Sequence, residues 1–359
     1  METTQSSLSV FLVVPTYNGQ DDIPGFFSTL QKSLVNTPYT VTVVAVDNNS
    51  HDNTVVLARE HFPAVHIIQN EENKGYAGVS AGMQYALYHG ADYVAVLNQD
   101  LVFDAEWISP LVKYLSDNPN TGAVQSQILL EGEESMINSS GNALHYLGFG
   151  YTLGHKRNVS EYTPSRPLFY CSGACVMFRA DALKKVGLFD EIFFLYHEDT
   201  DLSWRLRLAG YDLAMVSDSV VYHKYVFSKS TLKFFYIERN RLLTLFKNYE
   251  VRTLLLISPM LLVTEGAMLA SSVIGSLLRV PMLGFFSKMR TYGFFMKKST
   301  WKYIRQQRGI IHSQRQKRDR DLVPFMVSDI AFQDLSSPIV KYAMNPLTRA
   351  YWAIIKPLI

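Results

Sequence analysis

Three acidic residues lie within four positions, at Glu198, Asp199 and Asp201, directly after a segment rich in aromatic residues. Ionised carboxylates this close repel one another and are costly to bury unpaired, so a cation, a sugar hydroxyl or a metal must compensate them. A carboxylate beside a substrate hydroxyl can also act as a general base. The alternative is a helix N-terminus, where acidic side chains complement the dipole and Asp199 or Thr200 could cap the following helix. We expect Asp201 to be structural, as a first-turn acid or a partner of Arg205.

The composition of the 359-residue chain leaves room for one large domain and an appendage. Cys171 and Cys175 lie in an apolar stretch and provide neither a disulfide framework nor the other ligands of a zinc site. A reducing compartment is therefore expected. The first ten residues show no basic segment followed by an apolar one, so we expect no secretory signal and a catalytic part that stays in the cytoplasm.

Short apolar runs alternate with helical patterns through the first two hundred or so residues, which is typical of strands joined by crossover helices. The predicted strands are residues 10–14, 41–46, 65–68 and 93–97. The predicted helices are residues 23–34, 54–60, 77–89 and 108–116. Strands that are apolar throughout are covered on both faces. The pattern predicts a doubly wound α/β domain with a mostly parallel sheet.

Each predicted strand ends in polar residues. In doubly wound sheets ligands bind outside the carboxyl ends of the strands, so these ends should face one crevice. An Asp there can accept hydrogen bonds from a nucleobase or a ribose, and an aromatic residue beside it can stack on the base. A turn or N-cap role is the alternative for Asp47. The candidate ligand-binding residues at these ends are Pro15, Thr16, Tyr17, Asn18, Asp47, Asn49, Asn98 and Gln99.

These motifs, in this order, resemble glycosyltransferase family 2, and in particular its rhamnosyltransferase-like branch. The similarity covers roughly residues 11–225. It rests on residues 15–18, 46–52, 73–78, 98–100, 173–175 and 189–202. The resemblance implies a GT-A fold, which is Rossmann-like with helices flanking the sheet. It also implies a nucleotide-sugar donor, a divalent cation such as Mg²⁺ or Mn²⁺, and transfer with inversion at the anomeric carbon.

The resemblance implies roles for individual polar residues. Asp199 stands where the family has its catalytic base, with Glu198 orienting the acceptor or supporting the base, and burial should raise the pKa of Asp199. Asp100 and His223 are the implied metal ligands, an ordinary hydrogen-bonding role being the alternative for His223. Asn98 departs from the family's Asp-x-Asp pattern, so one metal carboxylate is missing.

Two further segments are implied to contact the donor. One is glycine-containing and opens a helix, where backbone can approach a diphosphate. The other is an Arg-Asn-Arg element that could hold diphosphate oxygens or simply line a solvated helix face. The candidate residues of these segments are Lys74, Gly75, Tyr76, Arg239 and Arg241.

We divide the chain into a transferase domain, residues 1–228, and a helical, membrane-associating region, residues 229–359. In the second, residues 254–278 are apolar or small and long enough to cross a bilayer, with Glu265 as an interior carboxylate to hide. Both a transmembrane helix and a pair of helices lying in the membrane interface agree with this pattern. Basic residues interleaved with aromatics follow, which favours an anionic membrane surface. These basic residues are Arg279, Lys288, Arg290, Lys297, Lys298, Lys302, Arg305, Arg308, Arg315, Lys317, Arg318 and Arg320.

The sequence therefore predicts an inverting, metal-dependent glycosyltransferase at the cytoplasmic face of the cell membrane, peripheral or with one C-terminal span. It would serve cell-surface polysaccharide synthesis, with a nucleotide-linked deoxyhexose such as dTDP-rhamnose as donor and a lipid-linked glycan as acceptor. Galactofuranose, a hexose or an N-acetylhexosamine is an alternative sugar. A catalytically inactive scaffold that binds nucleotide-sugars is a second alternative, prompted by Asn98. No nucleic-acid partner is expected, because no nucleic-acid module accompanies the basic residues.

Overall fold

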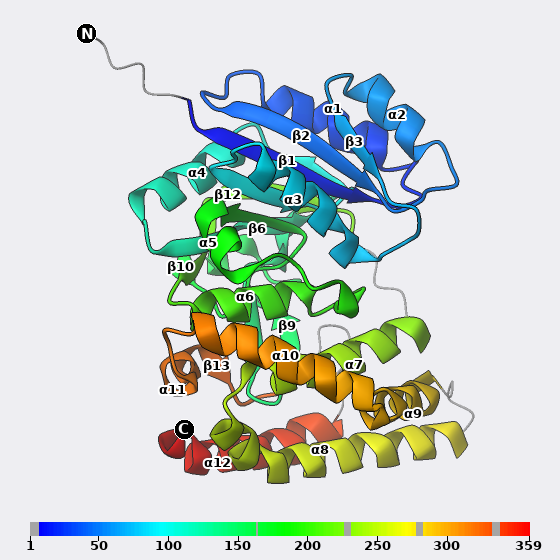
Figure 1. The fold of residues 1–359 in the computed structure, drawn as a ribbon, viewed down its shortest axis with the longest axis vertical. Coiled ribbons are helices and arrows are strands. Elements are labelled where there is room, and N and C mark those ends of the chain that lie inside the picture. The colour runs from blue at the N-terminus through cyan, green and yellow to red at the C-terminus, as the bar shows by residue number, and fades with distance from the viewer. Residues whose placement is uncertain (1–6, 163, 226–230, 278–282, 332–337) are drawn as a thin grey trace.

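The computed structural model describes residues 7–162, 164–225, 231–277, 283–331 and 338–359. A twisted sheet occupies the upper part of the molecule, and a layer of helices closes its lower end (Figure 1). The first six residues, Leu278 and Arg279 lie outside the described residues, so the expectations placed on them are not addressed by the structure.

The first four strands form a parallel array, as the sequence predicted. They are β1 (Ser9–Thr16), β2 (Thr40–Asp47), β3 (His66–Gln69) and β4 (Tyr93–Leu97). Their spatial order is β4-β1-β2-β3, and every pairing is parallel. Hydrophobic clusters bury both faces of β1, β2 and β4, which explains why their sequences are apolar throughout. Because the strands run in register, their carboxyl ends meet at one edge.

Helices cover both faces of this sheet. They are α1 (Ile23–Ser33), α2 (Thr54–His61), α3 (Ser80–Tyr88), α4 (Ile108–Asp117), α5 (Ala180–Val186) and α6 (Glu198–Leu208). The buried residues Ile23, Phe26 and Leu30 of α1 recur at helical spacing and pack in one cluster with α4. On the other face α3, α5 and α6 contribute to the second cluster. Short 3-10 segments, Tyr76–Val79 and Glu191–Phe193, precede α3 and α6.

The second half of the sheet is mixed, so the sheet as a whole is less parallel than predicted. Its strands are β5 (Leu101–Phe103), β6 (Thr121–Leu130), β7 (Glu133–Ser139), β10 (Arg166–Pro167), β11 (Cys175–Arg179) and β12 (Asp212–His223). Strand β11 lies antiparallel between β4 and β6, whereas β12 is parallel to β6. Strand β5 pairs antiparallel with the end of β12 and sets His223 opposite Leu101.

The carboxyl-terminal helices pack against α6 and share a core with it. They are α7 (Thr231–Asn248), α8 (Val251–Leu277), α9 (Leu283–Met296), α10 (Lys298–Gln314), α11 (Asp319–Leu322) and α12 (Asn345–Ile355). The buried side chain of Trp204 in α6 joins one cluster with Tyr249, Ile311 and Trp352. A small sheet of β13 (Met326–Val327), β8 (Asn142–His145) and β9 (Gly150–Thr152) adds a second connection. Residues 229–359 are therefore continuous with the core of the transferase part.

Within the described residues, α8 is one helix long and apolar enough over Val251–Val273 to cross a membrane. Its carboxylate, Glu265, forms ion pairs with Arg241 of α7 and Lys288 of α9. One face of α8 is therefore bound to the rest of the protein.

Asp201 joins α6 to α7 through a fully buried carboxylate. It accepts hydrogen bonds from Arg205 Nε at 2.9 Å, Lys247 Nζ at 3.1 Å and Asn248 Nδ2 at 3.0 Å. Burial opposes ionisation, but Lys247 and Arg205 together hold the pKa of Asp201 below its usual value. The predicted pairing with Arg205 is confirmed.

We expect Asp201→Asn to destabilise the protein by about 3–5 kcal/mol at neutral pH, because it leaves buried cations without their partner. A lowered pKa means that this contribution is present above the pKa of the unfolded state. The gap between wild type and variant should therefore shrink as pH falls below about 4. Denaturant unfolding at several pH values measures it. Asp181→Asn is the control, because Asp181 pairs with Lys184 on the surface; an equal loss in both variants would contradict the interpretation.

Candidate active site

The structure brings the four predicted strand ends together at one edge of the sheet. The backbone N–H of Tyr17, after β1, donates to Gln99 Oε1, after β4, at 2.9 Å. The side-chain amide of Asn70, after β3, donates to Asn48 Oδ1, after β2, at 3.0 Å. These hydrogen bonds fix the shape of the edge that the sequence assigned to the ligand.

Not every predicted residue at this edge is available to a ligand. Asp47 is 1% exposed and accepts hydrogen bonds from Ser50 N at 3.1 Å and Thr16 Oγ1 at 3.2 Å. The turn role, considered as the alternative for Asp47, is therefore the one that the structure shows. Pro15 and Thr16 are also buried in the sheet. Tyr17, Asn18 and Asn49 are exposed at this edge.

Asp100 and His223 lie side by side because β5, which begins directly after Asp100, pairs with the end of β12. His223 Nε2 is 3.1 Å from Asp100 Oδ1 and 3.3 Å from Asn98 Nδ2. On its other side, His223 Nδ1 lies 3.0 Å from Asn138 Oδ1 of β7. An amide oxygen only accepts, so we assign the hydrogen to Nδ1, which turns the Nε2 lone pair toward Asp100.

This arrangement fits a divalent cation. A bare imidazole nitrogen and a carboxylate oxygen at this separation repel one another unless a proton or a metal lies between them. The oxygens Asn98 Oδ1 and Asp100 Oδ1 are buried and, among the described residues, receive no hydrogen bond. Carboxylate and amide oxygens with an imidazole nitrogen are ligands for Mg²⁺ or Mn²⁺. In the described part of the chain no group of three or more His, Cys, Asp or Glu residues is arranged to hold a metal ion, so the third protein ligand here would have to be the amide of Asn98.

The acidic pair opens α6, which begins at Glu198, four residues before the helix considered from the sequence. Neither Asp199 nor Thr200 caps it, because both lie inside its first turn. Asp199 Oδ2 accepts from Gly173 N at 3.1 Å, and its Oδ1 accepts from Thr200 N at 2.6 Å. Burial raises the pKa of the half-buried Asp199 carboxyl against these hydrogen bonds, which confirms the predicted direction. This pair is thus an acid site without a cationic partner in the described structure.

Glu198 is more deeply buried than Asp199, at 6% exposure. Its Oε2 receives no hydrogen bond from the described residues. Burial and the charge of Asp199 raise the pKa of Glu198 well above its usual value. A carboxyl group held in this way is poised to bind a hydroxyl or a cation.

Backbone contacts place the acidic pair next to the strand end that carries Asp100. The N–H of Asn98, two residues before Asp100, donates to the Ala174 carbonyl at 2.9 Å, and the N–H of the preceding Gly173 donates to Asp199. The Gly173 carbonyl accepts from the Tyr76 hydroxyl, whose pKa is raised well above its usual value by burial. The acidic pair and the Asp100–His223 pair therefore border the same strand ends.

The segment around Gly75, which was predicted to approach a diphosphate, contacts protein atoms instead. Gly75 has a φ of +66°, and a Cβ there would lie 2.0 Å from the Phe194 carbonyl oxygen. Glycine is therefore required by contact with the segment before α6. Lys74 forms a partly exposed ion pair with Glu191, with 3.7 Å between Nζ and Oε2.

The prediction that Arg239 and Arg241 bind diphosphate oxygens is wrong for this structure. Arg241 is completely buried and pairs with Glu238 and Glu265. Arg239 Nη2 donates to the carbonyls of Ile192 and Phe193 at 2.6 and 2.9 Å. Both guanidinium groups are therefore occupied by protein groups, and the solvated helix face considered as the alternative is excluded as well.

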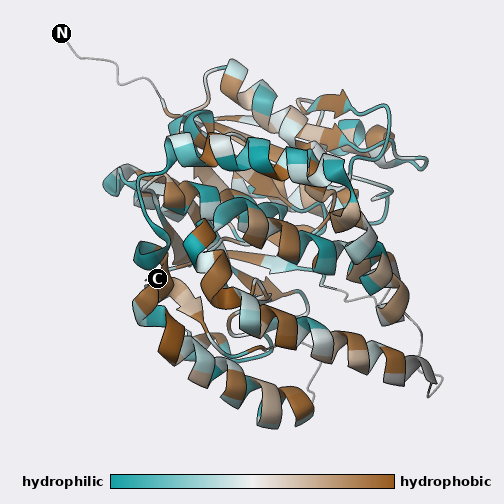
Figure 2. Cartoon of the chain, turned by 60° about the horizontal axis from the view of Figure 1, so that its bottom comes forward, coloured by the Kyte–Doolittle hydropathy of each residue, from teal (hydrophilic) through white to brown (hydrophobic). Residues whose placement is uncertain are grey.

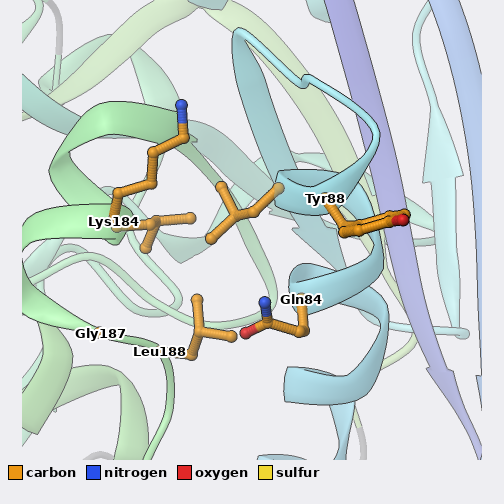
Figure 3. Close-up of a pocket in the computed structure, with 7 residues that line it drawn as sticks. Gln84, Tyr88, Lys184, Gly187 and Leu188 are labelled. Atoms are coloured by element: carbon orange, nitrogen blue, oxygen red, sulfur yellow. The ribbon is translucent and has the colours of Figure 1, made fainter.

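A surface pocket of about 420 Å³ lies between α3 and α5, away from this site (Figure 3). Its lining includes Gln84, Tyr88 and Lys184. These residues flank the amino end of β4, because α3 leads into that end and β11 leaves it toward α5. The pocket is therefore at the opposite edge of the sheet from the acidic residues.

Asn138 is a site residue that sequence reasoning missed, although it holds the imidazole of His223. It lies on β7, a strand that the sequence did not predict. Asn48 and Asn70 closely follow two predicted strands, but their mutual hydrogen bond depends on the register of β2 and β3. A single sequence carries no signal for such pairs.

Comparison with known proteins agrees with this fold. Residues 11–187 match the family described as Glycosyl transferase family 2. N-acetylglucosaminyl-diphospho-decaprenol L-rhamnosyltransferase of Mycobacterium tuberculosis is 28% identical over 239 residues, which are 59% of this chain and 75% of that protein. The low-salt glycan biosynthesis hexosyltransferase of Haloferax volcanii is 25% identical over 213 residues, 57% of this chain and 63% of that protein.

Two solved structures share the fold. GalNAc-T7 with UDP, GalNAc and Mn²⁺ superposes with a TM-score of 0.55 at 16% identity, over 70% of this chain and 49% of that chain. A mannosyltransferase of Pyrobaculum calidifontis with GDP-Man and Mn²⁺ gives a TM-score of 0.50 at 17% identity, over 87% and 86%. The fold and the family match define a GT-A glycosyltransferase. The chain carries a glycosyl transferase family 2 domain at residues 11–187.

We expect Glu198→Gln to raise the melting temperature at pH 7. A carboxyl whose pKa is raised on folding stabilises the folded state fully only below its unfolded pKa, and this contribution is lost as pH rises. The neutral amide avoids that cost, so the gain should vanish near pH 4. Differential scanning calorimetry at both pH values measures it, with the exposed Glu191→Gln as control. A lower melting temperature at pH 7 would show that Glu198 has a stabilising partner.

Proposed function

We propose that this protein is an inverting, metal-dependent glycosyltransferase that moves a deoxyhexose to a lipid-linked glycan acceptor in cell-surface polysaccharide synthesis. The first candidate for the sugar is rhamnose, with dTDP-rhamnose as the donor. The observation that carries the proposal is the position of Asp199 beside the strand end that bears the Asp100–His223 contact: Gly173 donates to Asp199, and the next residue, Ala174, accepts from Asn98. The name of the mycobacterial relative supports both the sugar and the lipid-linked acceptor.

Asp100 and His223, with the amide of Asn98, are the residues that would hold the cation. Two structural relatives are described with Mn²⁺. A bound Mg²⁺ or Mn²⁺ supplies positive charge that neutralises the departing nucleoside diphosphate. Asn138 fixes the imidazole ring of His223 so that its free nitrogen faces Asp100.

Asp199 is the proposed general base. An acceptor hydroxyl has a pKa far above neutral, so its proton must leave as the bond to the anomeric carbon forms. The N–H groups of Gly173 and Thr200 fix the orientation of the carboxylate, and its raised pKa makes it a better proton acceptor than an exposed Asp. Glu198 is available to orient the acceptor hydroxyl. In a single displacement the sugar leaves the diphosphate as the acceptor oxygen attacks, without a covalent intermediate.

Two alternatives to this function are each supported by a specific observation. The haloarchaeal relative is named a hexosyltransferase, so the same machinery with another sugar is the first. Asn98, in place of an acid, supports a catalytically inactive nucleotide-sugar-binding scaffold as the second. One observation argues against the scaffold. The burial of Glu198, whose Oε2 receives no hydrogen bond from the described residues, costs stability, and a protein that only binds a nucleotide-sugar does not require that cost.

The apolar outer face of α8 and α12 supports attachment to a membrane. These helices lie together at the end of the molecule farthest from β1–β3 (Figure 1). Apolar residues recur along the helices at this end, which faces the viewer in Figure 2. Leu255 and Leu262 of α8 are 69% and 72% exposed, and Ile354 of α12 is 68% exposed. The exposed charged residues of residues 251–273 and 338–359 are all basic, which suits an anionic lipid surface.

The contacts of α8 favour a helix lying in the interface over a span. Glu265 is bound to Arg241 and Lys288, and the inner face of α8 packs in the core shared with α6. Crossing a bilayer would break these contacts and expose the ions to hydrocarbon. These contacts support peripheral attachment, and the proposal assigns it to the cytoplasmic face.

Some basic residues predicted to face the membrane bind protein groups. Lys288 is buried with Glu238 and Glu265. Arg308 donates to backbone carbonyls of α7 and its end, and Arg315 pairs with Asp319. For these residues the prediction of a lipid-facing role is wrong.

Wild-type protein with Mn²⁺ and membrane lipid extract should release nucleoside diphosphate from one donor of a nucleotide-sugar panel. We expect Asp199→Asn to lower kcat by roughly 10²–10⁴-fold without loss of donor binding, because the base is removed and the site is otherwise kept. Chelation of the cation should also stop release. Asp181→Asn should behave as wild type. Donor binding by wild type with no release from any donor would favour the scaffold instead.

The triple variant Leu255→Glu, Leu262→Glu, Ile354→Glu should bind anionic phospholipid vesicles at least about tenfold more weakly in co-sedimentation, since each buried leucine contributes roughly 1.5–3 kcal/mol. The matched control is Val35→Glu, Val56→Glu, Tyr88→Glu, at exposed positions of the sheet end of the molecule. Equal pelleting of both variants with the wild type would refute the membrane face.

A further inference from the structure

The segment that leads into the acidic pair has an unfavourable backbone. Phe194, Tyr196 and His197 have φ values of 59°, 67° and 67°, in the left-handed region. Bulky L-residues are strained in such a conformation, so the surroundings must hold it. The next two residues are Glu198 and Asp199. The path of this segment therefore decides where both carboxylates lie.

A single buried amide on α7 meets three carbonyls of this segment. Asn240 is completely buried. Its Nδ2 lies 2.8 Å from the Phe193 oxygen, 2.8 Å from the Leu195 oxygen and 2.7 Å from the Tyr196 oxygen. Of these three carbonyls, only that of Phe193 receives a backbone hydrogen bond from the described residues, from the N–H of Leu195 at 2.6 Å, so Asn240 supplies donors to the carbonyls of Leu195 and Tyr196 as well.

Arg239 completes the contact and orients the amide. Its Nε donates to Asn240 Oδ1 at 2.8 Å, which leaves the Asn240 NH₂ group directed at the carbonyls. Its Nη2 donates to Ile192 and Phe193. The guanidinium also lies over the ring of Tyr236, 4.8 Å from its centroid. The two side chains therefore act on the segment as one unit.

The hydrogen bonds within the segment reach only part of its backbone: the N–H of Leu195 donates to the Phe193 carbonyl, and the N–H of Phe194 donates to the Glu191 carbonyl before it. Helix α6 begins after His197, and no side chain there caps it. On the opposite side the segment touches Gly75, whose missing side chain makes room for the Phe194 carbonyl. The Phe194 ring stacks on Tyr236, with 4.9 Å between centroids. Packing thus bounds the segment, and the pair on α7 supplies further hydrogen bonds.

We propose that Arg239 and Asn240 are positioning residues that hold residues 193–197 in their strained path and thereby set Asp199 for the transfer reaction. The inference rests on the proposed function, in which Asp199 is the base. An amide suits the role because it offers two hydrogens without a charge to bury. A carboxylate of the same shape would place acceptors against three carbonyl oxygens.

The test uses the full chain with two variants, Asn240→Ala and Asn240→Asp. We expect each to lower kcat by roughly 10²-fold, as a displacement of about 1 Å at a reacting group does, while the KM for the donor stays unchanged. Deuterium exchange of the peptide covering residues 193–199 should become faster in both. Asn240→Asp keeps the volume, so it separates lost donors from lost packing.

The matched control is Asn248→Ala. Asn248 is an equally buried amide on the same helix, but it donates to Asp201 Oδ1 and the Thr244 carbonyl. Lys247 still pairs with Asp201 in this variant and keeps α7 alongside α6, and Arg205 still pairs with Asp201 within α6. The variant should therefore lose stability while keeping kcat and the exchange rate of residues 193–199. A fall of kcat in this control equal to that in Asn240→Ala, or wild-type behaviour of Asn240→Asp, would overturn the inference.

The exchange measurement does not need turnover, so the two proposals fail separately. If Asp199→Asn keeps full turnover, the proposed function is wrong, and exchange still decides whether Asn240 holds the segment. If exchange at residues 193–199 is unchanged in both Asn240 variants, the inference is wrong even when Asp199 is the base.

Discussion

The buried charge of Asp201 is the constraint on which the arrangement of this protein depends. A fully buried carboxylate is tolerated only with cationic and hydrogen-bonding partners, and two of its partners, Lys247 and Asn248, come from the end of α7. This requirement fixes α7 alongside α6. Once α7 is fixed, its earlier turns bring Asn240 against the segment before α6 and Arg241 against α8. One ion cluster thus orders the elements that shape the site and those that form the outer helical layer.

Three acids in four positions have different fates because their neighbours differ. Asp201 points to the cations of α6 and α7, and its pKa falls. Glu198 and Asp199 face the strand ends, where the described residues offer backbone amides and a tyrosine, and burial raises their pKa values. The three carboxylates of one helical turn therefore have two roles: Asp201 stabilises the fold, and Glu198 and Asp199 are left available for a ligand. These two acids, which have no cationic partner among the described residues, carry the stability cost that is typical of a functional site.

The sequence predicted the parts of this protein that depend on local pattern. The strands β1, β2, β3 and β4 are short apolar runs, and such runs can be recognised in a sequence. The polar residues after them meet at one edge because the strands are parallel. Family resemblance placed Asp100 beside His223, and they are 3.1 Å apart. The roles of Asn138 and Asn240 could not be predicted, because their partners come from elements far away in the chain. Arg241 was misassigned for the same reason, since an arginine on a helix looks alike whether it meets a phosphate or a buried glutamate.

The dependence of the acidic pair on α7 limits how the enzyme can be divided. The family match ends at residue 187, before α6 and α7 begin, so the segment recognisable as the family domain lacks both the carboxylates and the helix that orders them. If α7 holds this segment as we propose, the helical layer cannot be exchanged for that of a relative as an independent module, because the exchange would remove the hydrogen bonds of Asn240 to residues 193–196. Changes in the layer would then be tolerated on its outer surface, with α7 left in place.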